Sequence, residues 1–215
     1  YEIAETADHQ LFIAMACYPG ESLKERIKRG PIGLEATVDY GIQLAGAIAT
    51  AHHHDILHRD IKPANILLTG TSQLKLVDFG LAGFPGPDGT SRLRPMTGTA
   101  AYMSPEQAKG GEMDNRGDIW SIGVVLYEML TGERLFPGKS VEAVAQLLKQ
   151  AQPVRIRHRA IPPELAGIIR KCLSREPADR YQTADALLED LKQAKAAIRK
   201  SGRHFASFLI AKVLQ

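Results

Sequence analysis

Two short stretches decide the fold of this chain: HRDIKPAN at residues 58–65 and DFG at residues 78–80. They bring two carboxylates, an amide and an ammonium group into one small part of the sequence. Strands expected at 66–68 and 74–77 would place Asp60 and Asp78 on loops beside strand ends. Such groups suit a site that holds a metal-bound triphosphate and accepts a proton from an attacking hydroxyl. The two stretches therefore predict phosphoryl transfer.

Each polar side chain of these stretches is of a type that suits one part of that chemistry. Asp60 can orient a hydroxyl and take its proton, an effect worth typically ~10²–10⁴ in rate. Lys62, two residues further on, can neutralise a moving γ-phosphoryl group. Asn65 offers a neutral oxygen and Asp78 a charged one, and both are ligands that Mg²⁺ prefers. The plainer alternative is that Asp60, Asn65 and Asp78 only cap loops.

Composition predicts one soluble globular domain with a sizeable core, since the 215 residues are 44% hydrophobic and 24% charged. A net charge of +3, spread along the chain, makes nucleic acid an unexpected partner. Cys17 and Cys172 form no disulfide pattern, and each is expected to be a buried thiol in a reducing compartment. No apolar run approaches the roughly 18–20 residues of a membrane span, so a cytoplasmic location is expected.

Hydrophobic periodicity and turn residues predict the other elements. A short helix that starts within 21–27 would have Ser22 as its N-cap and Gly30 at its end, and a nearly all-apolar helix over 118–130 would end at Gly132. The remaining expectations are strands at 1–4, 11–15 and 56–57, an extended connector at 16–20, helices at 34–54, 141–150, 163–173 and 183–198, and a long loop at 81–97.

The motifs resemble those of the eukaryotic-type protein kinase family, in the form found in bacteria. Residues 58–65 resemble its catalytic loop, 78–80 its metal-binding triplet, 104–106 (Ser-Pro-Glu) its Ala-Pro-Glu signature, and 118–123 its central buried helix. The resemblance covers residues 1 to about 195. It gives structural roles to His58, Phe79, Glu106, Asp118 and Arg180, with Arg180 expected to pair with Glu106.

The fold that this resemblance implies is the α+β protein kinase fold. Residues 1–15 would be a remnant of the small β lobe, and 16–20 the hinge. A complete, mainly helical large lobe would occupy 21–195, and 196–215 would be a tail or linker.

The resemblance also implies ATP with Mg²⁺, or Mn²⁺ in its place, and protein substrates that carry Ser or Thr. Lys62, and Gly-Thr ahead of Tyr102, resemble the serine/threonine branch. Thr99 would then lie between Asp60 and the substrate hydroxyl. The nucleotide would meet the backbones of Ala16 and Tyr18 beside a gatekeeper at Met15, with Leu67 under its ring and Lys62, Asn65 and Asp78 at its phosphates and metal.

Control through the segment 78–106 is expected because Arg59 precedes Asp60. A phosphate on Thr97, Thr90 or Ser91, in that order of preference, would pair with Arg59 and order this segment. Self-association for autophosphorylation would accompany it.

The chain also departs from the family pattern. The glycine-rich phosphate loop, the strand lysine and its glutamate partner are expected ahead of Tyr1, and no Gly-x-Gly-x-x-Gly occurs in these residues. A catalytically silent fragment or pseudokinase that binds partners is therefore the main alternative. A small-molecule kinase such as an aminoglycoside phosphotransferase is a third, which Arg59, the 104–106 motif and the 118–123 helix disfavour.

Three further features have ordinary interpretations. The histidines at 52–54 are expected to end a helix, with Asp55 in a left-handed turn, because adjacent helical positions point apart and do not suit one metal. The basic run 155–159 predicts a surface loop. The tail 195–215 predicts an amphipathic helix on a membrane surface, the start of a linker, or a plain surface helix.

Overall fold

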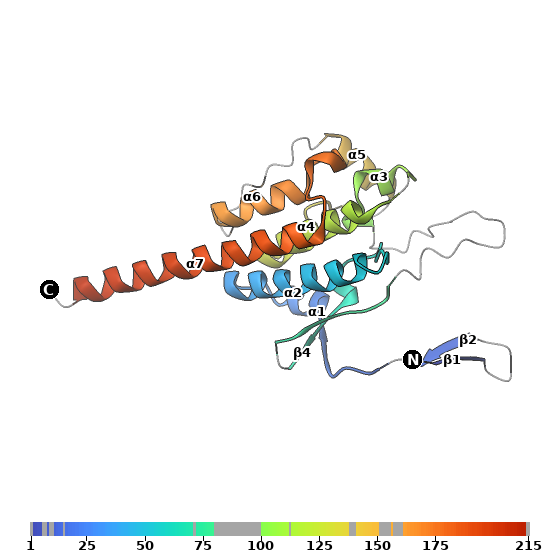
Figure 1. The fold of residues 1–215 in the computed structure, drawn as a ribbon, viewed down its shortest axis with the longest axis horizontal. Coiled ribbons are helices and arrows are strands. Elements are labelled where there is room, and N and C mark those ends of the chain that lie inside the picture. Colours follow the sequence, from blue (N-terminus) through green and yellow to red (C-terminus); the bar gives the residue numbers. More distant parts are fainter. Residues whose placement is uncertain are drawn as a thin grey trace.

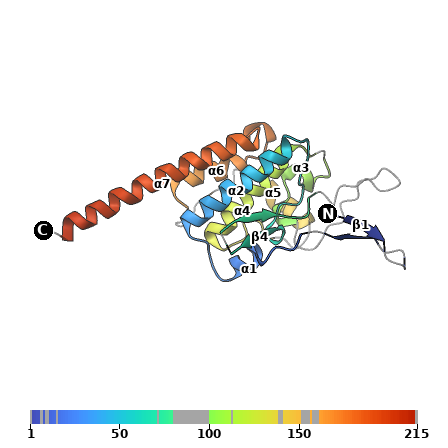
Figure 2. The same ribbon diagram turned by 60° about the horizontal axis from the view of Figure 1, so that its bottom comes forward.

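The structure is a computed structural model, and it describes residues 2–5, 8, 11–14, 16–70, 72–79, 100–111, 113–137, 141–150, 156 and 161–213. Its elements in chain order are β1 (Glu2–Glu5), β2 (Leu11–Ala14), β3 (Gly20–Ser22), α1 (Leu23–Lys28), α2 (Leu34–His52), the 3-10 turn η1 (Pro63–Asn65), β4 (Ile66–Thr69), β5 (Leu74–Leu76), η2 (Ala100–Tyr102), α3 (Pro105–Ala108), α4 (Asn115–Thr131), α5 (Val141–Gln150), α6 (Pro163–Cys172), η3 (Pro177–Asp179) and α7 (Ala184–Val213). A helical body carries a small sheet, and α7 projects beyond it at the end opposite the β1–β2 hairpin (Figure 1; Figure 2). The predicted loop at 81–97 and most of the run 155–159 lie outside the described residues.

Helix α4 forms the centre of the core because almost all of its residues are buried. Trp120 and Met129 are completely buried. Helices α2 and α6 both pack on α4, and α7 packs along α2. The helix begins at Asp114, whose side chain accepts from the Arg116 N–H, and it ends at Gly132 with a left-handed φ of 73°. The helix predicted from the apolar run, with its stop at Gly132, is confirmed.

Two antiparallel sheets contain the strands. Strand β1 pairs with β2, and the three-stranded sheet has the order β3-β4-β5. The sequence did not predict β3, which at three residues is too short for a periodic signal. Gly20 permits this pairing, because a Cβ built there would lie 2.2 Å from the Leu68 carbonyl oxygen.

The strand predicted at 56–57 is wrong. The Ile56 N–H donates to the Ala51 carbonyl (3.0 Å), so this residue closes the end of α2 and takes part in no ladder. Asp55 makes the turn with a φ of 56°, which confirms the predicted left-handed residue. The apolar pair Ile56 and Leu57 suggested a strand, but the hydrogen bond of Ile56 to the end of α2 forms in its place.

The other predicted helices are present. The Ser22 Oγ caps α1 by accepting from the Glu25 N–H (3.2 Å), and α5 covers the predicted 141–150. Helix α7 is longer than predicted and continues to Val213. Of the two thiols Cys172 is buried, whereas Cys17 is exposed, contrary to expectation, because the connector at 16–20 is exposed throughout. None of the described helices is both long and apolar enough to cross a membrane.

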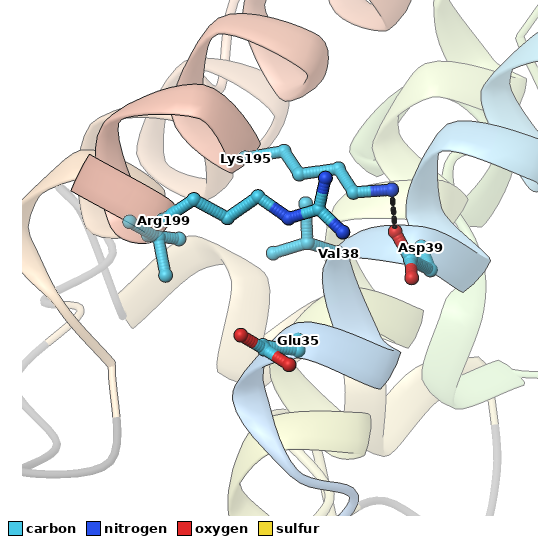
Figure 3. A pocket seen from close by; sticks show the side chains of 6 residues that line it. Glu35, Val38, Asp39, Lys195 and Arg199 are labelled. Carbon is cyan, nitrogen blue, oxygen red and sulfur yellow. Dashed lines mark ion pairs between the residues drawn. The ribbon is translucent and has the colours of Figure 1, made fainter. Parts of the chain in front are cut away.

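A pocket between α2 and α7 shows how the long helix is attached (Figure 3). Val38 and Ile198 contribute its apolar lining, and Lys195 reaches across to form an ion pair with Asp39. Both partners are more than one third exposed, so this pair is worth at most about 1 kcal/mol. The pocket lies at the beginning of α2, and the catalytic loop follows the end of that helix, so the pocket belongs to helix packing.

Two glycines test how closely the helices pack. A Cβ built on Gly123 of α4 would lie 2.6 Å from the Cys172 Cβ of α6, whereas a Cβ on Gly167 of α6 would meet nothing within 4 Å. We therefore expect Gly123→Ala to lower the free energy of unfolding by about 1–3 kcal/mol through overpacking. The matched change Gly167→Ala should raise it by about 0.5–1 kcal/mol because alanine is the better helix former. Urea unfolding of both variants measures this, and a Gly123→Ala variant as stable as wild type would contradict the packing.

Candidate active site

The loop 58–65 is held in place by one buried carboxylate, that of Asp118 on α4. Its Oδ2 accepts from the His58 N–H (2.9 Å) and its Oδ1 from the Arg59 N–H (2.8 Å). The His52 Nε2, at the end of α2, lies 2.9 Å from the same Oδ2. Because α4 is the centre of the core, these bonds fix the backbone of the loop to the buried core of the fold.

The ring of His58 connects three parts of the site. Its Nε2 lies 3.1 Å from the Val77 carbonyl oxygen, and its Nδ1 accepts from the Asp60 N–H (3.3 Å). These two bonds require a neutral ring with the proton on Nε2. Burial lowers the pKa of His58, although the negative charge of Asp118 acts to raise it. The lowered pKa agrees with a neutral ring. The Phe79 ring packs on it at 4.6 Å between centroids.

Asp60 has one engaged oxygen and one that is not engaged. Its Oδ2 accepts from the Lys62 Nζ (2.6 Å) and from the Asn65 Nδ2 (2.9 Å). The Asn65 amide also donates to the Asp60 carbonyl (2.9 Å), which fixes both residues relative to each other. The Asp60 Oδ1 is buried and has no hydrogen-bond partner within the described part of the chain. A buried carboxylate oxygen without a donor is costly, so this atom is arranged to receive one.

A backbone hydrogen bond brings Asp78 close to Asn65. The Val77 N–H donates to the Asn65 carbonyl (3.0 Å), and Asp78 follows with a left-handed φ of 61° and an exposed side chain. A non-glycine residue in this conformation costs of order 1–3 kcal/mol and is typical of functional sites. The structure thus brings Asp60, Lys62, Asn65 and Asp78 together around the ends of β4 and β5.

Glu106 and Arg180 form a two-pronged ion pair, with N···O distances of 2.6 and 2.8 Å. Arg180 is buried, and its remaining N–H groups donate to the carbonyls of Ser174, Arg116 and Arg175. Its guanidinium also lies 5.0 Å from the centroid of the Trp120 ring. Burial raises the pKa of Glu106, but the hydrogen bonds and charge of Arg180 outweigh this and lower it overall.

The residues expected to meet the nucleotide are only partly described. Ala16 and Tyr18 are exposed, and the Lys75 Nζ lies 5.6 Å from the centroid of the Tyr18 ring. Leu67 is in β4, opposite Ser22 on one side and Lys75 on the other. The other predicted residues, Met15, Thr99, Thr97, Thr90 and Ser91, lie outside the described residues.

Sequence reasoning did not find several contacts around the loop. Besides His52, these include a buried bond from the Tyr102 hydroxyl to the Glu128 Oε2 (2.6 Å) and one from the Ser121 Oγ to the Tyr102 carbonyl (2.9 Å). Burial raises the pKa of Glu128. These bonds attach the segment before α3 to the core helix α4. No local pattern predicts them, because each joins residues far apart in sequence.

Comparison with known proteins names the family to which this fold and this loop belong. The model of the protein kinase domain matches residues 1–191, and the chain belongs to this family. Among the residues that the structure describes, no group of three or more His, Cys, Asp and Glu side chains is placed to hold a metal ion.

Several curated relatives of the chain are named as serine/threonine-protein kinases. A probable one of Clostridium perfringens is 39% identical over 193 residues, which is 88% of this chain and 28% of that protein. PknB of Mycolicibacterium smegmatis is 39% identical over 87% of this chain and 31% of its own length. PknB of Mycobacterium tuberculosis is 36% identical over 84% of this chain and 30% of its own length. The chain therefore spans less than a third of the length of these three relatives.

Proposed function

We propose that this chain contains the catalytic centre of a kinase that transfers the γ-phosphate of ATP to Ser and Thr hydroxyls of proteins. The observation that carries the proposal is the asymmetry of the Asp60 carboxylate. Lys62 and Asn65 saturate Oδ2, while Oδ1 is buried and has no hydrogen-bond partner in the part of the chain that the structure describes. The names of the relatives support the choice of Ser and Thr as acceptors.

The chemical role of Asp60 follows from that asymmetry. A substrate hydroxyl that donates to Oδ1 would be oriented by it, and its proton would pass to the carboxylate as the hydroxyl oxygen bonds to phosphorus. The bond from phosphorus to the ADP oxygen breaks in the same transfer. Lys62, already in contact with Asp60, offers positive charge to the oxygens of the transferred group.

The donors at the site fit Mg²⁺, and Mn²⁺ by the same chemistry. Asn65 and the exposed carboxylate of Asp78 are the residues that would hold the ion. Mg²⁺ commonly takes one or two carboxylates and completes its octahedron with water and phosphate oxygens. When bound, the ion supplies charge that offsets the phosphate oxygens.

The proposal extends to control of the site by phosphorylation. The Arg59 backbone is fixed by Asp118 while the residue itself is exposed. Its guanidinium would pair with a phosphate on Thr97, Thr90 or Ser91, which stay predictions from the sequence. Self-association of two copies would bring one site to the acceptor of the other.

The test is Mg²⁺-dependent incorporation of γ-phosphate into a generic protein substrate by the full-length protein. We expect Asp78→Asn to raise the Mg²⁺ concentration for half-maximal rate by more than the ~10–100-fold that loss of an outer-shell partner costs. Asp55→Asn is the matched control, because Asp55 is also exposed and left-handed, with a φ of 56° against 61° for Asp78. Its Mg²⁺ dependence should equal that of wild type.

Two outcomes would contradict the proposal. Absence of incorporation by the wild-type protein at any Mg²⁺ concentration would favour a silent binding module. An equal Mg²⁺ dependence of Asp78→Asn and wild type would remove Asp78 from the metal site.

A further inference from the structure

We propose that Gln107 is a positioning residue that couples helix α3 to the catalytic loop by holding the peptide group between Arg59 and Asp60. The inference rests on the proposed kinase activity, and it deepens that proposal by naming a residue outside the kinase motifs. Gln107 is polar and 6% exposed, and it follows directly after the Glu106 that Arg180 anchors.

The peptide group before Asp60 is held at both of its polar edges. The Gln107 Nε2 donates to the Arg59 carbonyl (3.3 Å), and the Asp60 N–H donates to the His58 Nδ1 (3.3 Å). The peptide group one residue earlier is held by Asp118 through the Arg59 N–H. Rotation of the 59–60 peptide would turn the Asp60 side chain away from Lys62 and Asn65, and these bonds oppose that rotation.

The backbone conformation of Arg59 is strained, and rotation of the 59–60 peptide would relieve this strain. Its φ is 64°, in the left-handed region that disfavours residues with a Cβ. A strained backbone conformation persists only where several surrounding contacts hold it in place. The loss of one of the two bonds on the 59–60 peptide should therefore release part of this strain as motion next to Asp60.

The amide of Gln107 can be oriented in only one way. Its Oε1 accepts from the Ser104 N–H (3.0 Å), so its Nε2 faces the Arg59 carbonyl as a donor. A turned amide would place donor against donor and acceptor against acceptor. The first of these bonds belongs to the capping box of α3, in which the Gln107 N–H also donates to the Ser104 Oγ (3.4 Å). The Gln107 side chain thus caps α3 through its Oε1 and holds the catalytic loop through its Nε2. Mutation can separate these two interactions.

Three variants of the full-length protein separate them. Gln107→Glu keeps an acceptor for the Ser104 N–H but, as a carboxylate at pH 8, has no hydrogen for the Arg59 carbonyl. Ser104→Ala weakens the cap and keeps the Gln107 side chain. Gln107→Met removes both bonds at similar volume, and it replaces Gln107→Glu if the buried charge prevents folding. Each variant is assayed for kcat, for KM of ATP and protein substrate, for melting temperature, and for amide hydrogen exchange of the peptide covering 56–62.

We expect Gln107→Glu to lower kcat roughly 10–100-fold, the scale of a small misplacement of a catalytic group. Both KM values should stay unchanged, and exchange over 56–62 should become faster. Ser104→Ala should lower the melting temperature while kcat and the exchange over 56–62 stay as in wild type. Gln107→Met should show the loss of kcat together with the lower melting temperature.

Equal kcat and equal exchange in Gln107→Glu and wild type would overturn the inference, and so would a loss of kcat that Ser104→Ala reproduces. If the wild-type protein transfers no phosphate, the proposed function fails, and the exchange over 56–62 alone then decides the coupling. Faster exchange in Gln107→Glu would support the coupling even then, and unchanged exchange would refute it.

Discussion

Replacement of Asp60 by Asn is expected to lower kcat by about 10²–10⁴-fold, the usual contribution of a positioned general base. The reason lies in the neighbours of this side chain. Lys62 and Asn65 both donate to one carboxylate oxygen, so the single oxygen of an asparagine would turn towards them. Its NH₂ group would then face the substrate hydroxyl, where the carboxylate presents an acceptor. The variant would offer a donor to a group that must lose a proton.

Steady-state kinetics with saturating ATP and protein substrate measure this effect, with thermal unfolding as a check on the fold. Asp179→Asn is the matched control, because Asp179 is an exposed carboxylate in η3, apart from the loop 58–65. It should leave kcat unchanged. A kcat of Asp60→Asn equal to that of wild type would exclude Asp60 as the base.

Replacement of Arg180 by Leu is expected to lower the free energy of unfolding by about 3–5 kcal/mol, the cost of removing one partner of a buried ion pair. The change leaves Glu106 without its cation and frees three backbone carbonyls that Arg180 now bonds. Urea unfolding measures the effect. Arg175→Leu is the control, since its exposed ion pair with Glu176 has an N···O distance of 4.0 Å, and it should change stability by less than about 0.5 kcal/mol.

The stabilising effect of the Glu106–Arg180 pair should also depend on pH. The pKa of Glu106 is lower in the folded protein than its ordinary value of 4.5, so its contribution is complete above that value. It is lost as the pH falls through the folded pKa. The difference in stability between wild type and Arg180→Leu should therefore narrow below pH 4.5. A difference that stays constant between neutral and acid pH would show that Glu106 is not the partner that matters.

The sequence predicted those elements whose signals are local. Helix α1 could be predicted because Ser22 and Glu25 form a helix start within four residues, and α4 because its apolar run ends at a glycine that takes a left-handed turn. The residue types of the loop 58–65 also suggest a chemistry from the sequence alone, and the roles of these residues stay predictions. Motifs of this kind are short, so they can be read without knowledge of the fold.

Other features depend on contacts between distant parts of the chain. Strand β3 exists because Gly20 lets β4 approach its backbone, and residues 56–57 form no strand because Ile56 bonds back to Ala51. His52 and Gln107 lie on helices whose local patterns suit a surface residue as well as a buried one. Only the packing of α2, α3 and α4 around the loop brings their side chains to Asp118 and to the Arg59 carbonyl.

If this site phosphorylates hydroxyl side chains of proteins, the labelled amino acids will be serine and threonine. The full-length protein is incubated with γ-labelled ATP, Mg²⁺ and a generic protein substrate, and the labelled protein is hydrolysed to its phosphoamino acids. We expect label in phosphoserine and phosphothreonine and none when Asp60 is replaced by Asn. Label found only in phosphotyrosine or in small molecules, or label on protein that persists in Asp60→Asn, would contradict it.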